Sequence, residues 1–382
     1  MDSREPDEPP SPAQAVVDLG AIRHNVAALV DGAAGAQVMA VVKADGYGHG
    51  MIPSARAALQ AGASWLSVVH VGEALALRDA GIEAPILVMM AIPGEPHAEA
   101  IRRGTDVTAG STAMVAAIAE AAQAAGRPAR LQLKADTGLA RGGAPMADWP
   151  AVVGAALAAQ AAGHVEVTGL WSHFACADEP GHPSIARQLD TFSEALEVAE
   201  KAGARPEVRH IANTAATLTL PSARFDLVRP GGAVYGLSTL PGGAPPPLRP
   251  AMTLRTRLAQ VKRVPHGTGV SYGHRYVTNR ESTLGLVPLG YADGVPRFAS
   301  GRAEIYAKRR RWGIAGTVCM DQFVVDFGAE RAAAGDEIVL FGPGTDGEPT
   351  AQEWADSLGT ISYEIVTRIG NRVQRVYPEV TK

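Results

Sequence analysis

Basic or hydrogen-bonding side chains stand directly after five of the short apolar runs in this sequence. They are Lys43, Lys134, His173, His210 with Asn213, and Arg229 followed by Gly231 and Gly232. If these runs are strands of one parallel barrel, their carboxyl ends meet on a single rim, which is where such barrels carry their active sites. Because most of these side chains are cationic or donate hydrogen bonds, the pattern predicts an anionic ligand on that rim.

Lys43 is the residue whose placement most needs an explanation. It follows the apolar run Val38–Val42 and precedes the glycine-rich loop ADGYGHG, although the chain has only six lysines among its 35 lysines and arginines. A partly buried amine at a rigid strand end has a lowered pKa and suits Schiff-base formation with pyridoxal 5'-phosphate (PLP). The alternative is a lysine whose stem packs on the protein while its charge reaches solvent.

The elements that would position these residues follow from periodicity. Between about residue 37 and residue 232, β-branched runs alternate with Ala/Leu-rich amphipathic segments, many of which end at glycine. The pattern predicts eight strands, at 38–43, 65–70, 85–90, 105–108, 130–135, 166–172, 207–211 and 226–229. The clearest helices are expected at 71–80, 111–125, 148–162 and 184–202. Eight repeats favour an α/β fold of the (β/α)8 TIM-barrel type over a doubly wound sheet.

The pattern changes after residue 240. Residues 1–12 are acidic and proline-rich, so we expect a disordered tail there, followed by the barrel over 13–240. The stretch 241–250 is rich in proline and glycine, as is typical of a linker. Residues 251–382 alternate like an antiparallel β domain, with a helix near 351–358 and a last strand near 372–377. One hypothesis pairs the early strand in QAVVDLG with this second domain.

Composition excludes several classes of function. The 382 residues carry a net charge of −4, so no basic field exists to hold nucleic acid or an anionic membrane surface. No uncharged apolar stretch approaches the roughly 20 residues that span a bilayer. Cys176 and Cys319 are too few for a disulfide framework, which together with the start of the chain favours a reducing cytoplasm. We expect no metal site.

The segment AVVKADGYGHG resembles the cofactor-lysine motif of the alanine racemases, bacterial PLP-dependent isomerases that interconvert L- and D-alanine. Eight further segments resemble family segments in the family's order: LKADTGLARGG, GLWSHFACADE, HIANTAAT, RPGGAVYGL, VSYGHRY, LGYADGVPR, GTVCMDQ and ISYEIVTRIGNRV. The resemblance runs from about residue 13 to residue 377. It implies a PLP-binding (β/α)8 barrel followed by a C-terminal, mostly antiparallel β domain.

Carried onto this sequence, the resemblance implies two catalytic bases. Lys43 would bind PLP covalently and act as one base, and Tyr272 would act from the opposite face of the substrate α-carbon. A tyrosine phenolate at pH 7 costs roughly 4 kcal/mol, since the pKa of tyrosine is about 10. In the family, the side chain matching His210 supports this tyrosine and itself contacts the one matching Arg229.

The resemblance also implies the contacts of the cofactor. The phosphate would be held by Tyr47, Thr214, the backbone N–H groups of Gly231 and Gly232, and Tyr363, with Asn213 also in the cofactor site. His173 would face the pyridine ring. Arg229 would hydrogen-bond the pyridine nitrogen, and because a guanidinium keeps its proton, that nitrogen would stay unprotonated. Arg141 would position the phenolic oxygen of PLP and the substrate carboxylate.

In the family the second base comes from the partner subunit, so the resemblance implies a homodimer with two composite active sites. The partner would supply Tyr272, the supporting residues Tyr291, Cys319 and Asp321, and Met320, whose N–H would bind the substrate carboxylate. Lys134 matches a position that is often carbamylated. The added carboxylate would pair with Arg141, whereas an unmodified lysine would repel that arginine.

The leading interpretation is an alanine racemase that supplies D-alanine for peptidoglycan in a bacterial cytoplasm. The sequence departs from the family pattern at Thr214, where serine is usual, and at Leu139 and Gly142 beside Arg141. Arg275 also adds a cation near Tyr272. These departures leave open a broad-specificity or serine-preferring racemase and a cycloserine-tolerant self-resistance copy. A decarboxylase of related fold and a non-catalytic PLP carrier fit the motifs less well.

Overall fold

The computed structural model describes residues 13–240, 242 and 248–378. The tail predicted at 1–12 and most of the linker predicted at 241–250 lie outside the described residues. The chain falls into two compact units, Gly20–Arg249 and the residues before Gly20 together with those from Pro250 onward. The predicted fold class, a (β/α)8 barrel followed by a mostly antiparallel β domain, is confirmed.

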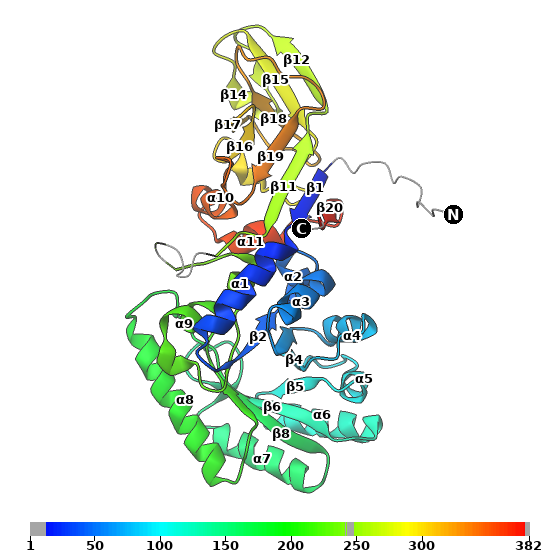
Figure 1. Cartoon of the computed structure of the whole chain (residues 1–382), viewed down its shortest axis with the longest axis vertical. Helices are drawn as coiled ribbons and strands as arrows, with labels where there is room; N and C mark the ends of the chain where they lie inside the picture. Colours follow the sequence, from blue (N-terminus) through cyan, green and yellow to red (C-terminus); the bar gives the residue numbers. More distant parts are fainter. Residues whose placement is uncertain (1–12, 241, 243–247, 379–382) are drawn as a thin grey trace, which may run out of the picture. The chain divides into compact units, whose positions relative to one another are not determined.

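Eight parallel strands are paired in succession in the barrel unit (Figure 1), and each coincides with one of the eight predicted runs. They are β2 (Gln37–Val41), β3 (Trp65–Val68), β4 (Ile86–Val88), β5 (Asp106–Ala109), β6 (Ala129–Asp136), β8 (Val165–Trp171), β9 (Val208–His210) and β10 (Leu227–Val228). A ninth, two-residue strand, β7 (Ala144–Pro145), pairs only with β6. Hydrogen-bonded pairs run in the order β10-β2-β3-β4-β5-β6-β8-β9. The two end strands meet where the Asp226 N–H donates to the Arg209 carbonyl (3.2 Å) and the Arg229 N–H to that of Ala212 (2.9 Å).

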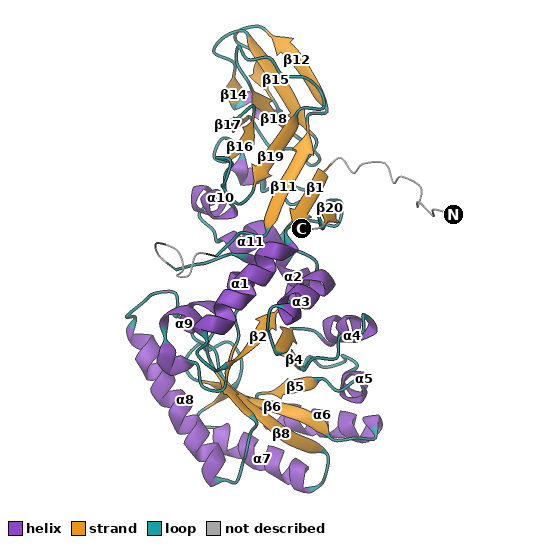
Figure 2. Ribbon diagram, viewed as in Figure 1, coloured by secondary structure: helices purple, strands orange, loops and turns teal. Residues whose placement is uncertain are grey.

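Helices cover the outer side of these strands (Figure 2). They are α1 (Leu19–Gly32), α3 (Met51–Gln60), α4 (Val71–Asp79), α5 (His97–Arg102), α6 (Thr112–Ala125), α7 (Trp149–Ala161), α8 (Pro183–Lys201) and α9 (Thr214–Thr219). The predicted helices match α4, α6, α7 and α8. Capping residues explain why the bounds of α6 could be predicted. At its start the Ser111 side chain accepts a hydrogen bond from the Met114 N–H, and at its end Gly126 adopts φ 72°.

The barrel interior contains one apolar set and one polar set of buried side chains. Met39, Trp65, Leu87, Val208 and Leu227 form an apolar cluster contributed by five strands, and burying each such side chain stabilises the fold by about 1.5–3 kcal/mol. A second set of buried interior side chains is polar, namely Ser67, Asp106, Gln132, Thr168 and His210. Four of these side chains, Asp106, Gln132, Thr168 and His210, are joined by hydrogen bonds. The Ser67 hydroxyl is buried without a hydrogen-bond partner among the described residues.

A nine-stranded sheet forms most of the C-terminal unit, in the order β12-β15-β18-β17-β16-β19-β11-β1-β20, beside the β13-β14 pair. The strands are β1 (Ala13–Val17), β11 (Met252–Arg257), β12 (Gln260–Val264), β13 (Gly269–Val270), β14 (Tyr276–Val277), β15 (Ser282–Val287), β16 (Glu304–Ala307), β17 (Arg310–Ala315), β18 (Phe323–Asp326), β19 (Glu337–Phe341) and β20 (Gln374–Val376). All pairings are antiparallel except β1 with β20.

The first strand belongs to this second sheet. β1 pairs antiparallel with β11, with Ala15 opposite Leu254, and parallel with β20. The unit also contains α10 (Ala351–Leu358), at the position expected for a helix, and α11 (Ser362–Thr367), which the sequence analysis did not predict. In the described part of the chain, no helix is long and apolar enough to cross a membrane.

Candidate active site

Lys43 follows β2 at the start of an unusual turn. The next four residues, Ala44–Tyr47, all have φ between 52° and 61°, a left-handed conformation that costs L-residues about 1–2 kcal/mol each. The turn is held by the Gly46 N–H, which donates to the Val42 carbonyl at 2.9 Å, and by the Ala44 N–H, which donates to Glu73 at 2.7 Å. The strained turn therefore fixes Lys43 and Tyr47 relative to the rim.

Tyr47, Thr214 and Gly231 come together beside this turn. The Tyr47 ring stacks on Tyr235 with 5.0 Å between ring centroids. A Cβ at Gly231 would collide with the Tyr47 hydroxyl, so only glycine fits there. The Thr214 hydroxyl oxygen accepts from the N–H of Gly231 (2.9 Å) and of Ala233 (3.4 Å). Hydroxyl and backbone N–H groups thus gather in one small region, as an anion site requires.

Asn213 and Gly232 lie beside the same region, where Asn213 caps a helix and Gly232 begins a 3-10 turn. The Asn213 side chain caps α9 by accepting from the Ala216 N–H at 3.1 Å. Gly232 begins the short 3-10 turn η2 (Gly232–Tyr235). The fifth residue expected at the phosphate, Tyr363, lies in α11 and therefore in the C-terminal unit.

Arg229 occupies the centre of the rim as a buried cation. One terminal nitrogen donates to His210 Nδ1 at 2.7 Å, the contact expected from the resemblance, and the other lies 3.1 Å from His173 Nδ1 and 2.9 Å from the Ser172 carbonyl. Burial lowers the pKa of Arg229 to about 9, so it still carries its charge at neutral pH. Burial and the Arg229 charge hold the pKa of both histidines well below the usual range, so both are neutral acceptors.

Two lysines and a second arginine surround Arg229. Burial, followed by the charges of Arg141 and Arg229, lowers the pKa of Lys43, while Glu73 opposes that shift. Burial, then Arg229 and Arg141, lowers the pKa of Lys134 to about 8. Cations held this close without matching carboxylates indicate a site built for an anion.

The carboxylate of Asp136, which acts on Lys134, is already engaged in a turn. One of its oxygens accepts from the N–H groups of Gly138 (3.0 Å), Leu139 (3.1 Å) and Ala140 (3.1 Å). These bonds fix the loop between Lys134 and Arg141, and Arg141 itself is exposed. The loop therefore brings Arg141 to the rim without neutralising it.

Three rim or interior residues were missed by the sequence analysis. Lys134 Nζ and the Arg229 guanidinium lie over the Trp171 ring, 4.4 Å and 4.7 Å from its centroid. The same ring stacks on His210. Gln132 and Asp106 extend the hydrogen bonds of His210 into the barrel. A signal existed, because Trp171 precedes His173 by two residues and Gln132 precedes Lys134 by two, the spacing of one strand face.

Tyr272 lies in the C-terminal unit, at the start of the turn η3 (Tyr272–His274), and is 73% exposed. Its backbone is nevertheless fixed. The Ser271 hydroxyl donates to the Thr317 carbonyl at 2.6 Å, and the Thr317 hydroxyl donates to the Tyr272 carbonyl at 2.9 Å. Tyr272 is thus a phenol presented to solvent from a well-anchored turn.

The other residues predicted for the second half of the site lie near this turn. Ser271 Oγ is 3.4 Å from Cys319 Sγ, and the Tyr291 N–H donates to the Cys319 carbonyl at 3.1 Å. Met320 follows and is 54% exposed, while Tyr291 is 43% exposed. We call Tyr272, Tyr291, Cys319 and Met320 the exposed cluster. Asp321 points its carboxylate to Arg372 at 2.8 Å.

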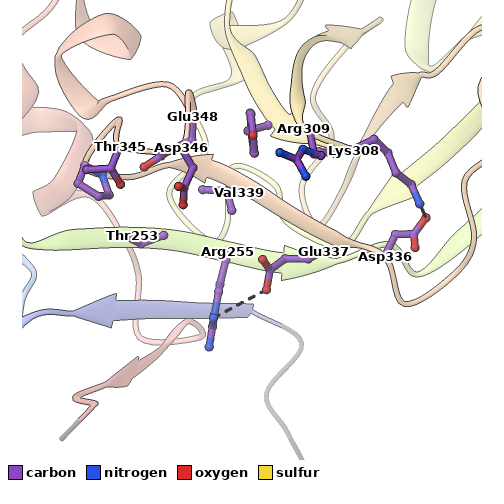
Figure 3. A pocket seen from close by; sticks show the side chains of 13 residues that line it. Thr253, Arg255, Lys308, Arg309, Asp336, Glu337, Val339, Thr345, Asp346 and Glu348 are labelled. Carbon is purple, nitrogen blue, oxygen red and sulfur yellow. Dashed lines mark hydrogen bonds and ion pairs between the residues drawn. The ribbon is translucent and has the colours of Figure 1, made fainter. Parts of the chain in front are cut away.

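A cavity of about 420 Å³ lies elsewhere on the C-terminal unit, between β11, β19 and the β16–β17 turn (Figure 3). Its charges face one another, with Lys308 Nζ 2.6 Å from Asp336 and Arg255 3.7 Å from Glu337. None of the residues predicted for the active site lines it. Among the described residues, no group of three or more His, Cys, Asp or Glu side chains is arranged to hold a metal ion.

Comparison with known proteins covers both units. The family models described as alanine racemase, N-terminal domain and C-terminal domain, match residues 17–239 and 251–377. The alanine racemase of Thermobifida fusca (strain YX) is 60% identical over 365 residues, which cover 96% of this chain and 98% of that protein.

Two solved structures extend this likeness to the fold. An alanine racemase from Streptomyces coelicolor A3(2) superposes with a TM-score of 0.94 at 58% identity and covers 96% of this chain and 98% of its own. An alanine racemase from D-cycloserine-producing Streptomyces lavendulae gives a TM-score of 0.94 at 55% identity, covering 98% of both chains. With nearly the whole chain matched, this protein belongs to the alanine racemase family.

Proposed function

We propose that this chain interconverts L-alanine and D-alanine with PLP as its cofactor and thereby supplies D-alanine for peptidoglycan. One observation carries the proposal beyond family membership. On a single rim of the barrel, a lysine of lowered pKa, a buried arginine and a group of hydroxyl and backbone N–H donors converge. Each of these groups matches one part of PLP.

The rim residues fit the cofactor that the family uses. Tyr47, Thr214 and the N–H groups of Gly231 and Gly232 would hold the phosphate, and the missing Cβ of Gly231 lets the Tyr47 hydroxyl approach the backbone there. In this structure the Gly231 N–H donates to the Thr214 hydroxyl. Lys43 would hold the cofactor covalently. When bound, PLP supplies the electron sink that stabilises negative charge on the α-carbon once a proton has left.

Lys43 is suited to both of its tasks. A protonated ammonium group is neither a nucleophile nor a base, and the burial and neighbouring cations that lower its pKa raise the fraction of free amine. The left-handed turn that follows it holds its backbone at the exit of β2. Lys43 would accept or donate the α-proton on one face of the substrate.

Arg229 would face the pyridine nitrogen as a fixed donor. Its cationic state is favoured because both flanking histidines are neutral and offer lone pairs rather than positive charge. A guanidinium does not give its proton away, so the arrangement weakens the electron sink. We infer that this limits the lifetime of charge on the α-carbon and suppresses side reactions.

Tyr272 would serve as the second base, and we propose that a second copy of the chain presents it, in a homodimer with composite active sites. Its exposure supports this proposal, because a catalytic phenol in the described chain stands uncovered together with Tyr291 and Met320. The N–H of Met320 would bind the substrate carboxylate opposite Arg141. Cys319 and Asp321 would support that segment.

We also propose that Lys134 is carbamylated. Its pKa of about 8 leaves a useful fraction of free amine near neutral pH, and that amine can attack CO2, forming an N–C bond and releasing one proton. The carboxylate produced would neutralise the repulsion with Arg141. Protein equilibrated with ¹³C-bicarbonate should show one carbamate carbonyl resonance that Lys134→Gln lacks. The same spectrum from both proteins would refute the modification.

The decisive test of the function is proton exchange coupled to inversion. PLP-replete protein is incubated with L-alanine in D2O, and α-deuterium and chirality are followed together. Deuterated D-alanine is the expected product. Deuterium with retained configuration would mean that only the base facing the α-hydrogen of L-alanine works, and an absence of exchange would remove alanine as the substrate.

A further inference from the structure

A continuous chain of hydrogen bonds crosses the barrel interior from Asp106 to Arg229. Gln132 Nε2 lies 2.9 Å from an Asp106 carboxylate oxygen, and Gln132 Oε1 lies 2.8 Å from His210 Nε2. His210 Nδ1 in turn lies 2.7 Å from Arg229. All but Arg229 are at most 1% exposed, so no solvent competes for these bonds.

The direction of every bond in this chain follows from Asp106. An ionised carboxylate only accepts hydrogen bonds, so Gln132 must turn its amide N–H2 toward Asp106 and its carbonyl oxygen toward His210. His210 must then carry its proton on Nε2 in order to donate to that oxygen. Its Nδ1 is left with a lone pair, which is the acceptor that Arg229 needs.

The carboxylate is itself held in place at both oxygens. Arg130 Nε donates to one oxygen at 2.7 Å, and the Thr168 hydroxyl donates to the oxygen that also serves Gln132, at 2.8 Å. The absence of a side chain at Gly169 gives the Gln132 amide its space, since a Cβ there would lie 2.7 Å from Gln132 Cδ. The orientation of Gln132 is therefore imposed by its surroundings.

We propose that Gln132, oriented by Asp106, is a positioning residue that locks His210 as the Nε2–H tautomer and so keeps Arg229 aimed at the cofactor as a cationic donor. The inference rests on the proposed function for its consequence in catalysis. The hydrogen-bond relay itself stands on the geometry of the barrel interior. It adds Asp106 and Gln132, neither of which touches the cofactor, to the residues that govern the reaction.

Asp106→Asn tests the relay with almost no change in volume. Arg130 still requires an oxygen, so the new amide must place its N–H2 group toward Gln132. Gln132 must then turn over and present its own N–H2 to His210, which is driven to the Nδ1–H tautomer and loses its bond from Arg229. We expect kcat for L-to-D conversion to fall about 10- to 100-fold, with the cofactor still bound.

The direct readout is the tautomer of His210, measured by ¹⁵N NMR on holoenzyme labelled at histidine and assigned with His210→Gln. Wild type should show Nε2–H, and Asp106→Asn should show Nδ1–H or a mixture. Thr168→Val, which removes a different hydrogen bond to the same carboxylate, is the matched control and should keep Nε2–H. A Nδ1–H or doubly protonated His210 in wild type overturns the proposal.

A charge swap separates orientation from simple loss of stability. In Asp106→Asn/Gln132→Glu, the carboxylate moves to position 132, where it accepts from the new amide and again from His210 Nε2. The swap should restore the Nε2–H tautomer and part of kcat, and a swap that behaves like Asp106→Asn contradicts the relay. Racemisation by wild type with the wrong tautomer would refute this inference alone, whereas the right tautomer without racemisation would refute the proposed function alone.

Discussion

The barrel rim and the exposed cluster differ in how much of their geometry one chain can provide. On the rim, Arg229 is buried and hydrogen-bonded to two histidines and a carbonyl. Lys43 directly precedes a turn whose left-handed backbone is strained but held by hydrogen bonds. In the exposed cluster the backbone around Tyr272 is equally well bonded, yet the phenol and the side chains of Tyr291 and Met320 face solvent.

This difference indicates that one chain is sufficient to bind the cofactor but not to complete the second proton transfer. The rim concentrates positive charge and donors, so it can hold an anionic cofactor within one chain. Ionising a tyrosine at pH 7 costs roughly 4 kcal/mol, since the ordinary pKa of tyrosine is about 10. As a base, Tyr272 therefore needs cationic neighbours, which the barrel rim of a second copy would supply in the proposed homodimer.

Removal of Lys43 should have the largest effect. Lys43→Ala eliminates both the covalent anchor and one base, so racemisation should fall about 10⁴-fold or more, and the visible absorption band of the bound cofactor should disappear. Lys201→Ala, at an exposed ion pair on α8, is the control and should change neither. A surviving band would disprove the assignment of Lys43.

The residues of the rim could be predicted from the sequence, whereas the hydrogen bonds in the barrel interior could not. Apolar runs followed by polar residues placed Lys43, Lys134, His173, His210 and Arg229 at strand ends, because period and turn signals are local. The left-handed turn at 44–47 was not predictable, since only Gly46 among its residues favours positive φ. The contact of Asp106 with Gln132 and His210 was equally hidden, because it joins β5, β6 and β9 only after the barrel closes.

The site residues of the C-terminal unit were harder to predict, because local patterns are weak there. Alternating runs marked its strands, but the short helix α11, which carries Tyr363, has only six residues and too little periodicity to detect. Tyr272 could be singled out only through the resemblance. By pattern alone, a tyrosine in a β-rich segment predicts cross-strand packing, which is what Tyr276 shows by packing on an apolar cluster that includes Val270, its partner on the neighbouring strand.

Tyr272→Phe should separate the two halves of the reaction. The variant should keep the cofactor band of the wild type, because the rim is untouched, while L-to-D conversion slows about 10³-fold through the loss of one general base. α-Deuterium exchange with retained configuration should persist through Lys43 only for the alanine enantiomer whose α-hydrogen faces that lysine. Tyr276→Phe is the matched control in the same unit, and conversion at a normal rate in Tyr272→Phe would exclude that residue from the mechanism.

Mixed oligomers sharpen the comparison between the two regions. If each site combines a rim from one chain with Tyr272 from another, a dimer of one Lys43→Ala chain and one Tyr272→Phe chain holds one intact site. Random mixing of the two inactive proteins should then restore about a quarter of wild-type activity. Sites built within one chain would give no recovery, and a strictly monomeric active protein would contradict the composite site directly.

The smallest predicted effect is on the free energy of unfolding, through the positive charge of Lys134 when no anion is bound at the rim. The pKa of Lys134 is about 8 in the folded protein against an ordinary 10.5. Between these values the unfolded chain holds the proton and the folded chain does not, so stability rises with pH across this window. Below about pH 8 both states are protonated, and the buried charge costs the folded state its full penalty, about 3 kcal/mol.

Lys134→Met should remove that penalty. In cofactor-free protein and CO2-free buffer, its free energy of unfolding in urea should exceed that of wild type at pH 7, and the gap should narrow by about 2 kcal/mol at pH 9.5. Lys201→Met, at an exposed lysine, should track wild type at both pH values. A gap between Lys134→Met and wild type that stays the same at both pH values would contradict the lowered pKa of Lys134.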